Sequence, residues 1–259
     1  MNINLKKSPF FYQKRYKLKW GNIIIGWRLG TTDFEQYLKL SVKRYYYAYI
    51  SFFDKVKDFC DIGGFWGIFP LTLKELRFKV YMTEILKYYG NSFESLFEYL
   101  NNEGLKIIDV DPFSESFDVK EKFDIMTAMA ILEHYLHSPK LFFKNILSII
   151  NKTGRLYIEV PNIAYYYKRK KLLFGNTPFT DIKDIYMSDI PFIGHHHEYT
   201  FDEIKYLTYI NNLKIEKAYF YTYSYPMNVK YILKNPSAWL SQLLFKKTRE
   251  IIAVSCTLE

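Results

Sequence analysis

Between about residues 33 and 57, apolar side chains recur every three or four positions, as at Leu38 and Val42. Such spacing places them on one face of a long amphipathic helix. The first 20 residues are basic and aromatic without a clear period, and residues 22–27 fit a short strand or an edge loop. We therefore predict a mostly helical N-terminal extension over residues 1–55.

After this extension, short apolar runs alternate with stretches of helical periodicity. The runs typical of strands lie near residues 58–62, 78–83, 105–110, 123–128 and 154–160. Helices are expected near residues 66–76, 91–102, 138–150 and 201–211. Strands that alternate with helices of this length predict a mainly parallel sheet with helices on both faces.

Two further apolar runs, residues 214–223 and 250–257, follow the last of these helices. We expect them to pair as an antiparallel C-terminal hairpin that closes the sheet. The pattern as a whole predicts an α/β, doubly wound, mainly parallel seven-stranded sheet in one domain over residues 56–259, with a substrate-capping insertion at residues 161–198.

The composition is that of an ordinary globular protein, with 49% hydrophobic and 24% charged residues in a chain of 259. Its net charge of +9 comes partly from lysines spread over the whole chain. That charge is compatible with an anionic substrate, nucleic acid or a membrane surface, but it requires none of them. Neither Cys60 nor Cys256 has metal-ligand spacing, so both are expected to be buried free thiols. With no secretion signal or membrane-spanning run in view, we expect a cytoplasmic protein.

The most informative short motif runs from Asp61 to Gly67 (DIGGFWG), between an apolar strand and a helix. Gly63, Gly64 and Gly67 let the backbone approach a ligand closely, and a helix N-terminus offers free N–H groups. The glycine spacing differs from the G-x-G-x-x-G of dinucleotide-binding proteins. At the strand end Asp61 would repel a phosphate group, so the motif suits a cationic ligand.

Other candidate ligand-binding residues lie where the remaining predicted strands end, because ligands of a doubly wound sheet bind at the carboxyl ends of its strands. Glu84 follows the second strand, and Asp109 and Asp111 follow the third. Residues 126–130 end the fourth strand and residues 159–162 the fifth.

In this order, the motifs resemble those of class I S-adenosylmethionine (SAM) dependent methyltransferases. The resemblance implies a Rossmann-like fold with SAM as the cofactor. The run from Asp61 to Gly67 would then surround the methionine moiety, and Glu84 would accept hydrogen bonds from both ribose hydroxyls. Asp111, or Asp109 in its place, would lie beside the adenine amino group, and Ala128 would also contact the cofactor.

The most specific part of the resemblance, which covers about residues 56–210, is FDIMTAMAILEHYLHSPKLFFKNILSIINKTGRLYIEVPN at residues 123–162. The later GHHHEYTFDEIKYL, residues 194–207, resembles a substrate-side segment of the subgroup that methylates small molecules, sugars and quinone precursors. Phe65 departs from the family pattern, which has its central glycine at that position.

All five histidines lie in two places, a pair after the predicted fourth strand and the triplet His195–His197 before a helix. Methyl transfer to a hydroxyl requires an aligned acceptor and removal of its proton, and histidine suits that role near neutral pH. The candidate catalytic residues are His134 and either His195 or His196, with Glu133 as an orienting carboxylate. The alternative is that these histidines only pack beside the cofactor or line the surface.

Some relatives carry Glu-x-x-Glu-His and a later histidine around a divalent ion. Here Ala130 stands where the first glutamate would be, which leaves Glu133, His134 and His195. Because two or three ligands are few for a metal site, the sequence predicts no functional metal.

The predicted insertion is rich in aromatic and basic residues, above all at residues 165–171 (YYYKRKK). Tyrosines suit stacking on a substrate and cations suit a phosphate or carboxylate, while a solvated basic helix face is the simpler alternative. Residues 239–249 are similarly amphipathic and basic, which fits contact with a membrane surface, a partner or the domain itself.

The sequence therefore predicts a SAM-dependent methyltransferase that acts on an oxygen, or less readily a nitrogen, of a small-molecule, sugar, glycan-type or lipid-precursor acceptor. The basic residues would also accommodate a phosphorylated acceptor. An RNA methyltransferase is one alternative, because the N-terminus is basic and aromatic, although no recognisable RNA-binding module is present. A non-catalytic, methyltransferase-like scaffold subunit is the other.

Overall fold

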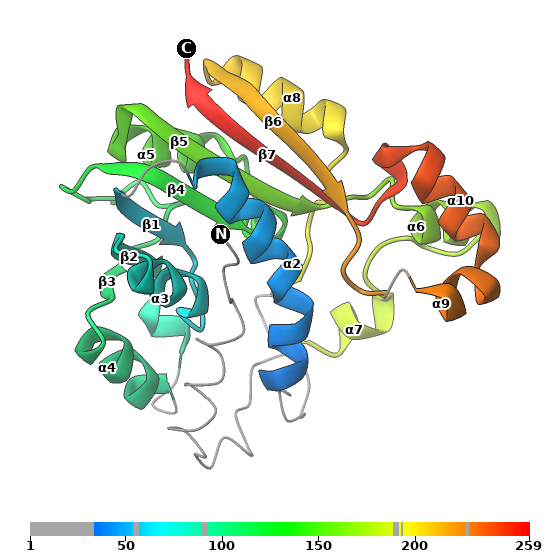
Figure 1. Ribbon diagram of the computed structural model, residues 1–259, viewed down its shortest axis with the longest axis horizontal. Helices are drawn as coiled ribbons and strands as arrows, with labels where there is room; N and C mark the ends of the chain where they lie inside the picture. Colours follow the sequence, from blue (N-terminus) through cyan, green and yellow to red (C-terminus); the bar gives the residue numbers. More distant parts are fainter. Residues whose placement is uncertain (1–33, 54–56, 90–92, 189–191, 193, 226–227) are drawn as a thin grey trace. The chain divides into compact units, whose positions relative to one another are not determined.

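The computed structural model describes residues 34–53, 57–89, 93–188, 192, 194–225 and 228–259 (Figure 1). Within them the chain forms two compact units: the residues up to Thr127 together with 141–154, and residues 128–140 together with 155–259. The strand or loop predicted at residues 22–27 lies outside the described residues. The domain boundary near residue 55 stays a prediction.

The first unit is built on parallel strands connected by helices. Its elements in chain order are α2 (Phe34–Phe52), β1 (Asp58–Ile62), α3 (Ile68–Glu75), β2 (Lys79–Glu84), the 3-10 turn η1 (Leu86–Tyr88), α4 (Glu94–Asn102), β3 (Lys106–Asp109), most of β4 (Phe123–Met129), most of α5 (Lys140–Ile149) and the start of β5 (Ile150–Pro161). In the parallel register Asp61 lies opposite Met82, and Glu84 lies opposite Asp109. The ends of β1, β2 and β3 therefore share one edge of the sheet.

Aromatic packing holds α2 to this unit and confirms the amphipathic helix expected from the sequence. Phe52 is 1% exposed, and its ring centroid lies 6.0 Å from that of Phe59, 6.4 Å from Phe69 and 6.2 Å from Phe78. Ring pairs at these separations add to the free energy of burying apolar surface. One face of α2 thus covers β1, α3 and the approach to β2.

The second unit contains the antiparallel part of the sheet. After the 3-10 turn η3 (Leu132–His134) and most of β5, its elements are α6 (Tyr166–Leu173), α7 (Ile182–Tyr186), α8 (Phe201–Ile210), β6 (Leu213–Tyr221), α9 (Val229–Lys234), α10 (Pro236–Leu244), the 3-10 turn η4 (Lys246–Thr248) and β7 (Ile251–Leu258). β7 pairs antiparallel with β5 on one side and with β6 on the other. The predicted antiparallel pairing is confirmed, with α9 and α10 between its two strands in the sequence.

The strands follow the order β3-β2-β1-β4-β5-β7-β6 in one seven-stranded sheet. This order confirms the doubly wound, mainly parallel fold with an antiparallel C-terminal part. Cys60 and Cys256 are buried free thiols, as predicted. Among the residues that the structure describes, none of the helices combines the length and apolar character needed to span a bilayer.

Candidate functional site

The glycine-rich turn connects the end of β1 to the start of α3, and two of its glycines are required by packing. A Cβ on Gly64 would lie 2.9 Å from the Cβ and Sδ atoms of Met82 on β2. A Cβ on Gly67 would lie 2.7 Å from Leu100 of α4, and Gly67 also adopts φ +64°, which L side chains rarely occupy. The turn can therefore lie this close to β2 and α4 only because these positions lack side chains.

Phe65 adopts a left-handed backbone although it is not a glycine. Its φ is 46°, and its N–H donates a 2.5 Å hydrogen bond to Oε1 of Glu84. The ring centroid lies 4.7 Å from Trp66 and 6.1 Å from Tyr89. Aromatic contacts and a charge-assisted hydrogen bond thus offset the roughly 1–3 kcal/mol that such a backbone costs a non-glycine residue.

Asp61 sits at the carboxyl end of β1 with its side chain fixed. The residue is 4% exposed, and Oδ1 accepts a 2.5 Å hydrogen bond from the Thr127 hydroxyl. The Asp61 carboxyl is therefore held in a fixed position beside the glycine turn.

Glu84 ends β2 and is 6% exposed. Besides the Phe65 bond, its Oε2 accepts a 2.8 Å hydrogen bond from the Tyr89 hydroxyl. Burial raises the pKa of Glu84 to about 7, although both hydrogen bonds favour the ionised form and oppose the rise. The carboxyl therefore titrates close to neutral pH.

Both candidate acids after β3 have local backbone partners. Asp111 accepts a 2.8 Å hydrogen bond from the Phe113 N–H, and Asp109 accepts a 3.0 Å hydrogen bond from the Leu86 N–H at the start of η1. Each carboxylate keeps further lone pairs for a ligand. Ala128 is 1% exposed within β4 and falls in the second unit.

In the second unit, Glu133 and His134 belong to η3, directly after β4. The turn starts from Ala130, whose φ of 60° redirects the chain and whose N–H donates to the Glu159 carbonyl on β5. The His196 N–H donates a 2.7 Å hydrogen bond to the Glu133 carbonyl. Two segments about 60 residues apart in the sequence are thereby joined.

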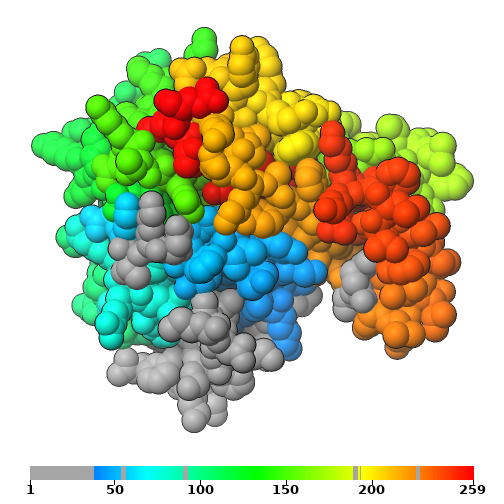
Figure 2. All heavy atoms as spheres, turned by 45° about the horizontal axis from the view of Figure 1, so that its top comes forward, coloured from blue at the N-terminus to red at the C-terminus, as the bar shows by residue number. Residues whose placement is uncertain are grey.

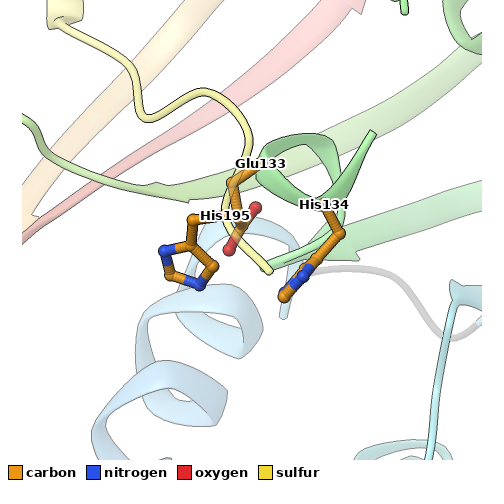
Figure 3. A group of neighbouring side chains, drawn as sticks. All are labelled: Glu133, His134 and His195. Carbon is orange, nitrogen blue, oxygen red and sulfur yellow. The ribbon is translucent and has the colours of Figure 1, made fainter. Parts of the chain in front are cut away.

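Glu133, His134 and His195 form a compact cluster in which one ligand atom from each lies within 4.8 Å of the others. Figure 3 shows the Glu133 carboxylate between the two imidazole rings, whose centroids are 4.9 Å apart. Glu133 is fully buried, whereas both histidines keep exposed surface. The structure thus brings together three of the four predicted catalytic residues.

The histidine triplet divides among different partners. His195 Nδ1 lies 2.8 Å from Oε1 of Glu198, while His196 Nε2 lies 3.0 Å from the Phe192 carbonyl oxygen. His197 Nε2 lies 3.1 Å from Oε1 of Glu203. His196 therefore contacts Glu133 through its backbone, while its ring contacts Phe192.

Both cluster histidines are held in the neutral form. Burial, followed by the neighbouring His134, lowers the pKa of His195 to about 4. Burial also lowers the pKa of His134 below its usual value, and a hydrogen bond with the Gly194 backbone partly opposes that shift. Neutral imidazoles beside a buried carboxyl can accept a proton from a substrate or coordinate a cation.

Two imidazoles and a carboxylate also match the protein ligands of many catalytic zinc sites. The sequence predicted no metal because Ala130 lacks a ligand atom. Glu133, His134 and His195 nevertheless lie close enough together for one ligand atom of each to contact the same ion.

Glu198 is the residue that sequence reasoning missed. Its carboxylate contacts both His195 and Lys168 of α6, and burial lowers the pKa of this lysine to about 8. Glu198 directly follows the histidine triplet, so its position was the available signal. It joins α6 to the cluster of Glu133, His134 and His195.

Comparison with known proteins gives one family match, whose profile is described as a methyltransferase domain and covers residues 36–217. A solved SAM-dependent methyltransferase from Clostridium acetobutylicum is similar with a TM-score of 0.54 and 14% identity, covering 86% of this chain and 97% of that one. Magnesium protoporphyrin IX methyltransferase from Synechocystis, solved with bound SAH, has a TM-score of 0.54 and 12% identity, covering 98% and 95%. The glycopeptide N-methyltransferase MtfA has a TM-score of 0.52 and 7% identity, covering 85% and 90%. No curated protein matches the chain significantly.

Proposed function

Because this chain belongs to the methyltransferase-domain family and is a SAM-dependent methyltransferase, we propose that it methylates an oxygen atom of a small-molecule or glycan-type acceptor. The observation that carries the proposal is the cluster of Glu133, His134 and His195, with its ligand atoms within 4.8 Å. Transfer to a hydroxyl needs a base, and a neutral imidazole is suited to that role.

On the donor side, we assign cofactor binding to Asp61, Glu84 and Asp111, together with the glycine turn. The fixed carboxylate of Asp61 suits the cationic methionine end of SAM, and the two oxygens of Glu84 suit a pair of ribose hydroxyls. The chemistry that bound SAM supplies is an activated methyl group. These residues contribute binding and orientation.

On the acceptor side, His134 is the better candidate base. A pKa of about 4 makes His195 a weak proton acceptor, whereas the pKa of His134 is less strongly depressed. The buried Glu133 would stabilise the imidazolium once the proton has moved, and Glu198 would orient the His195 ring. Lys168 would attract an anionic group of the acceptor.

The test is a screen of hydroxyl-bearing acceptors with radiolabelled SAM, followed by identification of the methylated atom in the product by NMR. His134→Gln should lower kcat by about 100-fold or more, the usual contribution of general-base catalysis, while SAH affinity stays unchanged. His137→Gln is the matched control, because this exposed histidine lies outside the cluster. Methylation at nitrogen, or full activity of His134→Gln, would overturn the assignment.

A further inference from the structure

We define a lobe of the second unit as residues 166–187 and 229–248, which contain α6, α7, α9, α10 and η4. α6, α9 and α10 pack together, with a 2.8 Å hydrogen bond between Tyr166 and Ser237 and a 2.9 Å bond between Tyr167 and Tyr231. α7 follows α6 in the chain (Figure 1). Figure 2 shows residues 229–248 of this lobe, in orange and red, on the molecular surface.

The lobe concentrates the exposed apolar side chains of the protein. Of the 22 exposed large hydrophobic residues in the described part of the chain, 14 belong to it. They are Leu172, Leu173, Phe174, Phe179, Ile182, Ile185, Tyr186, Met187, Val229, Leu233, Leu240, Leu243, Leu244 and Phe245. A group this large usually marks an interaction surface.

The same segments are strongly basic. Residues 166–187 and 229–248 contain nine Lys and Arg residues against two Asp, a net charge of +7, where the whole chain carries +9. Both aspartates flank or lie in α7, and neither α6, α9 nor α10 contains an acidic residue. α6 and α9 therefore carry cations without acids, α10 carries no charged residue, and Lys246 and Lys247 follow it in η4.

This combination favours a lipid surface over another protein. Lysine is depleted at protein–protein interfaces, where its charge would be desolvated. At an anionic bilayer, leucine and phenylalanine enter the boundary between headgroups and acyl chains while lysines reach the phosphates. We propose that the lobe docks this methyltransferase peripherally on an anionic membrane.

The lobe also has a direct connection to the catalytic cluster. α6 carries the exposed Leu172 and Leu173 at its end, and its Lys168 pairs with Glu198, which contacts His195. A docked lobe would therefore hold the acceptor side of the second unit near the membrane, where an amphipathic or lipid-borne acceptor is found. This last step rests on the proposed function, whereas membrane binding does not.

The experiment is flotation of the full chain with phosphatidylcholine vesicles, with or without phosphatidylserine. We expect binding to the phosphatidylserine vesicles that weakens with salt. Lys230→Glu/Lys234→Glu should weaken it at least tenfold, since each lysine at such a surface contributes about a fivefold gain in affinity. Leu233→Gln/Leu244→Gln should weaken it through lost insertion. Lys120→Glu/Lys144→Glu, which changes exposed lysines outside the lobe, is the matched control.

Circular dichroism and SAH affinity establish that each variant is folded. No binding to anionic vesicles, or an equal loss in the Lys120/Lys144 control, would refute the proposal. So would full binding by the leucine variant, which would indicate an attraction to polyanions such as RNA. Concentration-dependent dimerisation that Leu233→Gln/Leu244→Gln abolishes would instead assign the lobe to a second copy of the chain.

Discussion

The pKa of Glu84 predicts that cofactor affinity changes across neutral pH. The ionised carboxyl accepts at both oxygens and makes charge-assisted hydrogen bonds with the ribose hydroxyls, whereas the protonated form uses one oxygen as a donor. With a pKa of about 7, roughly one molecule in eleven is ionised at pH 6 and ten in eleven at pH 8. SAH should therefore bind about tenfold more weakly at pH 6 than at pH 8, a difference of about 1.4 kcal/mol in the free energy of binding.

Isothermal titration calorimetry with SAH at pH 6, 7 and 8 measures this change, and Glu84→Gln is the matched variant. Glutamine retains an acceptor for the Phe65 N–H but does not ionise in this range, so its affinity should be weaker and should lose this dependence on pH. Wild-type affinity that is constant from pH 6 to pH 8 would refute the reasoning. Constant wild-type affinity would mean that Glu84 keeps its hydrogen bonds to Tyr89 and Phe65 and does not bind the ribose.

The free protein should show the opposite dependence in its stability. Because burial raises the folded-state pKa of Glu84 above its usual 4.5, the folded state favours the protonated carboxyl. Stability from this group is present below pH 4.5 and is lost as the pH rises to about 7, by roughly 3 kcal/mol. Urea unfolding of wild type and Glu84→Gln at several pH values isolates the contribution of this residue.

Three further predictions concern other parts of the two units. Gly67→Ala should lower the free energy of unfolding, measured in urea, by about 2–4 kcal/mol, because a Cβ there meets Leu100 at 2.7 Å. Gly175→Ala is the control: with φ +75° and nothing within 4 Å of the added Cβ, it should show only the smaller backbone cost. Equal losses in the two variants would contradict the packing argument. Asp61→Asn keeps an acceptor for Thr127 but loses the charge, so SAH affinity should fall about tenfold or more by calorimetry, while Asp58→Asn at the other end of β1 should leave it unchanged. Methyl transfer should survive chelation of metal ions, because His134 is proposed as a base. The cluster would instead be a metal centre if chelation abolished activity and Zn²⁺ or Mn²⁺ restored it in wild type and in His197→Ala but not in His195→Ala.

Much of the fold was predictable because burial imposes a period on the sequence. β1, β2 and β4 lie within a residue of the predicted runs, since strands covered on both faces are continuously apolar. β5 starts at Ile150, four residues earlier than expected, because the three residues after Ile150 are polar and partly exposed and so lack the apolar pattern of a strand. The place of β7 between β5 and β6 was not predictable, since strand order depends on tertiary pairing that periodicity does not encode.

The site was predictable in its residue types more than in its connections. The strand-end rule selected Asp61 and Glu84 as candidates from their positions, whereas Glu133 was selected from the resemblance and from its place beside His134. The bond from Phe65 to Glu84 was not predictable, because it depends on a left-handed backbone at a non-glycine residue. Nor was the link from Lys168 through Glu198 to His195, because it joins residues about 30 positions apart.

The position of β7 also constrains how the chain folds. β5 ends at Pro161, and its antiparallel partner begins only at Ile251, so some 90 residues must be made before the two can pair. Until then β6 has no strand beside it, and its exposed edge can pair wrongly with other chains. Contacts between such distant residues form slowly, because a long loop must close first. The antiparallel half of the sheet should therefore assemble last, and the folding rate of the second unit depends on the arrival of β7.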